Sequence, residues 1–187
     1  PKEVLEKISP STLKYLVLIN PTILLLIAVV IGTLLFDKVG FSVPTISTIL
    51  KIEQPKIKFI EQIKFGILLG LLTGILTTVT GLIFKTSLPQ EFIDIGNKIK
   101  ITPIARFGYG GITEELLMRF GFMTLVVWII FKITKKLGNS TYWTGIILAS
   151  IIFAVGHFPV VFNAVQNPTI SLLTYVLIGN SIAGLFF

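Results

Sequence analysis

The sequence contains no cysteine and few charged residues. Without cysteine there can be no disulfide, no thiolate metal ligand and no cysteine nucleophile. Charged residues make up 13% of the 187 residues and hydrophobic residues 53%, whereas a soluble domain carries about 25% charged residues. With a mean hydropathy of +0.90, the chain has too little polar surface to cover itself in water. The composition therefore predicts an integral membrane protein with lipid around most of its surface.

Acidic residues are fewer than basic ones, and the net charge is +7. Most of the excess comes from lysines between the apolar runs, a pattern that suits contact with anionic lipid headgroups. Nucleic-acid binding is the alternative explanation for a pI near 9.7. Because the basic residues are spread over several loops that flank apolar runs, we expect membrane lipids as partners and no nucleic acid. Lysine and arginine fall almost evenly on the two sides, so the orientation in the membrane stays open.

Long apolar runs predict the fold, because a membrane span needs about 20 consecutive apolar residues. Five runs qualify as spans: about Leu13 to Phe36, Phe65 to Phe84, Ile104 to Lys132, Tyr142 to Phe162, and Thr169 to Phe187. The prediction is an all-α, polytopic transmembrane helical bundle that forms a single domain over residues 1–187. Because the last run stops at Phe187, we expect a C-terminal truncation. In the second run we expect Gly66, Gly70, Gly74 and Gly81 to let neighbouring helices approach closely.

The third predicted span carries three charged residues within six positions: Glu114, Glu115 and Arg119. One charged side chain at mid-membrane costs about 2.5–3.5 kcal/mol on insertion scales, so three of them need a reason. Glu115 and Arg119 are four residues apart on a helix and are expected to form an ion pair. Glu114 is rotated by about 100° from Glu115 and points elsewhere. A structural Arg–Glu lock would explain the pair, but the second glutamate favours a functional site with Glu114 as a general base.

The fourth predicted span carries His157, the only histidine of the chain. Phe153 lies four residues earlier on the same helical face, and Pro159 predicts a bend just after the histidine. A lone histidine in a membrane helix could simply bond a neighbouring carbonyl. Its value here lies in a partner span with two carboxylates, so we expect spans three and four to be neighbours, with Glu114 and His157 facing a shared polar cavity.

Glu-Glu-x-x-x-Arg on one span and Phe-x-x-x-His on the next resemble the CAAX prenyl protease and bacteriocin-processing (CPBP) family of intramembrane proteases. The resemblance covers about Arg106 to Phe187. It implies that Glu114 activates the attacking water, that His157 helps to hold that water or a metal, and that Glu115 and Arg119 form an orienting pair. The substrate would be a membrane-associated peptide or protein tail, with the need for prenylation left open. The family's third motif, His-x-x-x-Asn/Asp, is expected beyond Phe187.

The metal content of such a site stays open at this point. A catalytic zinc takes about three protein ligands and one open position. Glu114 and His157 are the candidate ligands for a divalent metal such as zinc, because Glu115 is expected to bind Arg119. A water activated by glutamate without a metal fits these residues at least as well. For the oxyanion of a hydrolytic intermediate, Asn163 and Asn180 are the nearby amides to consider.

Two other functions use the same residues. A proton-coupled membrane transporter could pass protons among Glu114, Glu115 and His157. A catalytically dead scaffold could keep the fold and bind partners. The family resemblance favours the protease over both.

Overall fold

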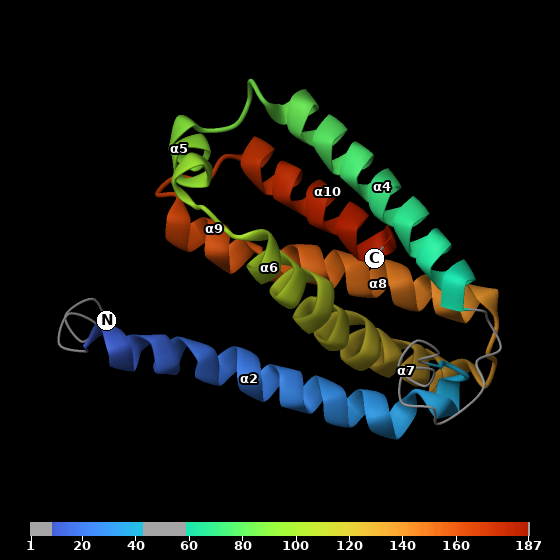
Figure 1. Cartoon of the computed structure of the whole chain (residues 1–187). Coiled ribbons are helices and arrows are strands. Elements are labelled where there is room, and N and C mark those ends of the chain that lie inside the picture. The colour runs from blue at the N-terminus through green and yellow to red at the C-terminus, as the bar shows by residue number, and fades with distance from the viewer. Residues whose placement is uncertain (1–8, 43–58, 187) are drawn as a thin grey trace.

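The computed structural model describes residues 9–42 and 59–186, and every regular element in these ranges is a helix. The elements are α2 (Pro10–Leu35), η1 (Asp37–Val39), α4 (Phe59–Phe84), α5 (Gln90–Lys98), α6 (Pro103–Arg106), η2 (Phe107–Thr113), η3 (Leu116–Met123), α7 (Thr124–Thr134), α8 (Asn139–Gly156), α9 (Phe158–Ala164) and α10 (Ile170–Phe186). The all-α prediction is confirmed for this part of the chain (Figure 1).

Four helical segments are long and apolar enough to cross a membrane: Leu18–Leu35, Phe59–Phe84, Pro103–Thr134 and Asn139–Ala164. They correspond to the first four predicted spans. The fifth, α10, is apolar but shorter. Large apolar side chains on these helices are exposed, as expected of surfaces that face lipid.

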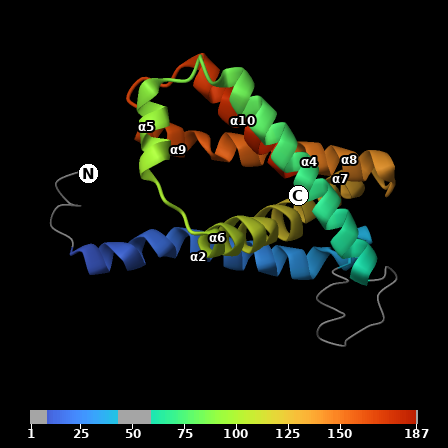
Figure 2. The same cartoon turned by 45° about the horizontal axis from the view of Figure 1, so that its top comes forward.

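The helices form two groups joined through α8. On one side, α2 packs along the third span, chiefly against η3. On the other side, α4 packs against α10, and α10 also packs against α8 (Figures 1 and 2). The helix α8 contacts both α7 and η3 as well, so the third and fourth spans are neighbours, as the sequence predicts. The charged residues of the third span therefore lie where the two groups of helices meet.

Close approach between helices depends on glycines other than the predicted ones. A Cβ atom at Gly121 would meet Ala28 of α2, and one at Gly145 would meet Val127 of α7. By contrast, a Cβ atom at Gly66, Gly70, Gly74 or Gly81 would meet no atom of the described residues within 4 Å. The prediction for these four glycines is therefore wrong here. The number of glycines in a helix does not reveal which face meets a neighbour.

The third span departs from α-helical geometry around its charged residues. Two π-helical stretches, η2 and η3, flank Glu114 and Glu115. The backbone N–H of Glu114 donates to the carbonyl of Tyr109, five residues earlier, as in a π-helix. The side-chain hydroxyls of Thr113 and Thr124 donate to the carbonyls of Gly108 and Arg119, also five residues earlier. π-helical turns are rare and occur frequently at functional sites. The sequence pattern predicted a span here but not this winding.

The fourth span is interrupted at His157, which ends α8 and precedes α9. Pro159 lies in the first turn of α9, where a missing N–H is tolerated. The bend predicted from Pro159 is confirmed. Because His157 lies at this break, its ring occupies the end of a helix rather than the side of a continuous one.

A small core fixes the end of the molecule beyond this break. Val161, Val165, Leu172 and Val176 form its buried cluster. The helix α5 covers it through Phe92, whose ring meets Tyr175 edge-on at 6.0 Å between centroids. The helix α5 therefore anchors α9 and α10.

Candidate active site

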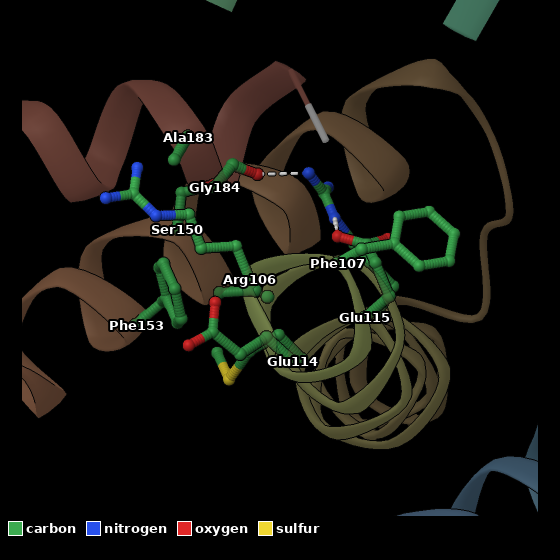
Figure 3. A pocket seen from close by; sticks show the side chains of 13 residues that line it. Arg106, Phe107, Glu114, Glu115, Ser150, Phe153, Ala183 and Gly184 are labelled. Carbon is green, nitrogen blue, oxygen red and sulfur yellow. Dashed lines mark hydrogen bonds and ion pairs between the residues drawn. The ribbon is translucent and has the colours of Figure 1, made fainter. Parts of the chain in front are cut away.

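A cavity of about 340 Å³ lies between the third span, α8 and α10. Figure 3 shows its lining from close by. The lining residues are Arg106, Phe107, Gly110, Gly111, Glu114, Glu115, Met118, Arg119, Ala149, Ser150, Phe153, Ala183 and Gly184. Three of the four predicted site residues, Glu114, Glu115 and Arg119, are therefore in one wall. The cavity is apolar over most of its surface, with a few convergent polar groups, as ligand sites usually are.

Arg119 is held by two partners. Its Nε lies 3.8 Å from Oε1 of Glu115, one turn earlier. Its Nη2 donates a hydrogen bond to the backbone carbonyl of Gly184 on α10. Nη1 also lies 3.9 Å from Sδ of Met123. The predicted Glu115–Arg119 ion pair is thus present, and it also connects the third span to α10.

Glu114 points away from this ion pair. Figure 3 shows the carboxylates of Glu114 and Glu115 on different sides of the helix that carries them. Among the described residues, Glu114 has no ion pair and no hydrogen bond to its carboxylate. A Cβ atom at Gly110 would lie 3.8 Å from Oε2 of Glu114, so this glycine leaves open space beside the carboxylate. The carboxylate is therefore free to act on a molecule in the cavity.

His157 is half-buried and does not line the cavity. Its ring meets that of Phe153, a lining residue, at 4.6 Å between centroids and an angle of 77°. Its Nδ1 lies 2.8 Å from the carbonyl oxygen of Phe153. The prediction that Glu114 and His157 face one polar cavity is therefore wrong for the described residues: the lining is mostly apolar and includes Phe153 in place of His157.

The Nδ1 contact determines the tautomer of His157. A carbonyl oxygen can only accept, so Nδ1 carries the proton and donates it. In the neutral ring, Nε2 then holds the lone pair and can accept a proton or bind a ligand.

Asn163 and Asn180 do not fit the role considered for them. The amide of Asn163 donates to the carbonyl of Pro159 at 2.8 Å, and that of Asn180 to the carbonyl of Val176 at 2.8 Å. Neither residue lines the cavity. Both amides form hydrogen bonds within their own helices. Such local side chain–backbone bonds compete with binding to a ligand, and the sequence alone does not show them.

Two polar lining residues, Arg106 and Ser150, are not predicted by the sequence pattern. Ser150 is buried, with its hydroxyl donating to the carbonyl of Ile146 at 2.7 Å. A Cβ atom added at Gly184 would lie only 2.8 Å from the Cα of Ser150, so α8 and α10 are in close contact at this point. Arg106 lies eight residues before Glu114. Its position in the first turns of a predicted span was the one sequence feature that could have indicated a role for it.

The donor set of the described residues falls short of a catalytic zinc site. Within residues 9–42 and 59–186, no group of three or more His, Cys, Asp or Glu side chains could hold a metal ion. Glu115 is occupied by Arg119, and Glu114 points to the other side. Two candidate ligands, Glu114 and His157, are fewer than the three that catalytic zinc sites use.

The comparison with known families agrees with this site. The model of the family described as "Type II CAAX prenyl endopeptidase Rce1-like" matches residues 100–187. This part of the chain is similar to that family, a branch of the CPBP intramembrane proteases. The matched segment contains the whole cavity lining, from Arg106 to Gly184. No curated protein and no solved structure matches the chain.

The family similarity and the apolar helices together indicate the general class of the protein. It is a multi-pass integral membrane protein, in agreement with its four long apolar helices. The similarity supports an activity of the intramembrane endopeptidase class in general.

Proposed function

We propose that this protein hydrolyses a peptide bond of a membrane-associated peptide or protein tail, with Glu114 activating the attacking water and His157 assisting. The observation that carries the proposal is the pair of adjacent glutamates with separate tasks. Glu115 is bound by Arg119, whereas the Glu114 carboxylate has no partner among the described residues and borders a cavity. A carboxylate without a charged partner inside a membrane span marks a functional site by default.

The surroundings of Glu114 suit a general base. The cavity wall is mostly apolar, and in such surroundings charges and dipoles act more strongly on reacting groups than in water. A water molecule between Glu114 and His157 would be held by the carboxylate and by Nε2 of the imidazole.

The chemical steps then follow from general acid–base catalysis. The water oxygen attacks the carbonyl carbon of the scissile peptide bond while Glu114 takes a proton from the water. The tetrahedral intermediate collapses, the C–N bond breaks, and the proton passes from Glu114 to the departing nitrogen. The products are a new carboxyl end and a new amino end. His157 holds the water by accepting a hydrogen bond at Nε2, and no step requires a metal.

Arg119 acts as a positioning residue in this proposal. By binding Glu115 and the carbonyl of Gly184, it fixes the third span against α10. That fixed geometry sets the direction of the Glu114 side chain, which is on the residue just before Glu115. Its own donors are directed to Glu115 and Gly184 and not to the substrate.

A cleavage assay in ¹⁸O-labelled water tests the proposal. The purified protein in lipid nanodiscs is incubated with a peptide in two forms, one bearing a prenyl chain near its C-terminus and one without it. We expect a single new cut, with one ¹⁸O atom in the new carboxyl group, and the prenylated form tests the substrate class that the family description names. Intact peptides in both forms after long incubation would count against the proposal.

A further inference from the structure

Arg106 lies in the cavity wall and, among the described residues, forms no ion pair. It ends α6, in the first turns of the third span, and it is exposed. Its guanidinium has no hydrogen bond and no ion pair among the described residues. An arginine in a membrane helix is costly to place and usually faces a cavity or a partner. This one faces the cavity that contains Glu114.

The two arginines of the cavity differ in availability. Arg119 is engaged by Glu115 and Gly184. Figure 3 shows the guanidinium of Arg106 on the other side of the cavity from that ion pair. Its planar group presents five N–H donors in a fork that matches a carboxylate through two parallel hydrogen bonds. The free cation in this wall is therefore suited to an anion that enters the cavity.

The charge balance of the cavity also indicates that Arg106 is suited to bind an anion. The negative charge of Glu115 is balanced by Arg119, so Glu114 is the carboxylate whose charge lacks a close cation on its own helix. An anionic group on an entering peptide would be repelled by Glu114, since like charges raise each other's energy in a low dielectric. A guanidinium at Arg106 offsets that repulsion and gives the anion a defined place.

We propose that Arg106 binds a carboxylate of the substrate peptide and so selects and orients it in the cavity. This inference rests on the proposed function, because the substrate of an endopeptidase is a peptide, and the anions of a peptide are its C-terminal carboxylate and its acidic side chains. Arg106 is a binding residue in this account. It acts on the bound substrate and leaves the bond-breaking steps to Glu114.

The test uses one apolar fluorescent peptide in three forms: a free C-terminal acid, a C-terminal amide, and the amide with its last residue replaced by glutamate. Binding and cleavage are both measured in nanodiscs of zwitterionic lipid. The variants are Arg106→Gln, Arg106→Lys and Lys100→Gln. Lys100 is the matched control, because it is exposed, has the same charge and does not line the cavity.

We expect Arg106→Gln to weaken binding of the free acid by about tenfold, the size of one well-placed charged contact. Binding of the amide should change little. Arg106→Lys should fall between, because lysine keeps the charge and loses the fork. Lys100→Gln should match the wild type. If the glutamate-bearing amide responds like the free acid, the bound group is any carboxylate, and if it does not, the bound group is the C-terminus.

Equal weakening of acid and amide by Arg106→Gln would overturn the inference and assign this arginine to a lipid phosphate or to the fold. No weakening of either would overturn it as well. Because binding is read without turnover, these outcomes stay separate from a failure of cleavage. A protein that binds the acid through Arg106 but cuts no peptide would contradict the proposed function alone.

Discussion

The guanidinium of Arg119 donates a hydrogen bond to the backbone carbonyl of Gly184, a residue 65 positions further along the chain. The same guanidinium pairs with Glu115 on its own helix. One side chain therefore joins the charged segment of the third span to α10 and closes one side of the cavity.

Loss of that guanidinium should destabilise the fold. In Arg119→Ala the Glu115 carboxylate loses its cation and the Gly184 carbonyl its donor. A buried group left without its partner costs about 1–3 kcal/mol. We expect a lower melting temperature in detergent and a lower yield. The double variant Glu115→Gln with Arg119→Ala should melt above Arg119→Ala alone, because it removes the stranded charge. Melting of Arg119→Ala at the wild-type temperature would show that the pair is dispensable.

The contact between Gly184 and Ser150 predicts a second effect. In Gly184→Ala the new Cβ would lie 2.8 Å from Cα and 2.9 Å from Cβ of Ser150, so α8 and α10 must separate. Overpacking of this kind costs about 1–3 kcal/mol. We expect a lower melting temperature and reduced cleavage together.

The matched control for that variant is Gly74→Ala. No described atom lies within 4 Å of a Cβ at Gly74, which is also inside a helix. This change should leave melting and cleavage unchanged or raise the melting temperature slightly, because alanine favours the helix. The explanation by close packing fails if both alanine variants behave alike.

His157 should affect the rate more than the stability. We expect His157→Ala to lower kcat by about 10²–10⁴, the usual contribution of a group that assists proton transfer. Its fold should persist, since the ring is half-buried at a helix end. Asn163→Ala is the control, because that amide bonds within α9 and lies outside the cavity. A larger loss of kcat in Asn163→Ala than in His157→Ala would contradict the assignment.

Chelation tests the proposed absence of a metal-dependent step. After dialysis against EDTA and 1,10-phenanthroline, the protein should cleave its peptide at the original rate. The donor set of the described residues falls short of the three ligands of a catalytic zinc. Loss of activity that zinc restores, with the melting temperature unchanged, would place a metal in the mechanism.

The sequence predicted the spans and the ion pair well because both depend on local patterns. Apolar length defines a membrane helix, and a spacing of four residues brings Glu115 and Arg119 together on a helix. Glu114 lies in the same cavity wall as this pair because all three residues are within six positions of one helix.

Other features required the packing of distant segments. The partnership of Arg119 with Gly184 joins residues far apart in the chain, and no local pattern predicts it. The close-packed glycines were predicted on α4 but occur elsewhere, at Gly121, Gly145 and Gly184. The roles of Glu114 and His157 and the motif expected beyond Phe187 stay predictions.

Replacement of Glu114 tests the central claim most directly. Glu114→Gln keeps the size of the side chain and its ability to form hydrogen bonds but removes the base. Glu61→Gln is the control, because it makes the same change on an exposed residue of α4. Both variants and the wild type are compared for cleavage of the same peptide and for melting in detergent. The account predicts that Glu114→Gln melts like the wild type and cleaves about 10²–10⁴ times more slowly, whereas Glu61→Gln cleaves normally. Wild-type cleavage by Glu114→Gln would contradict the account.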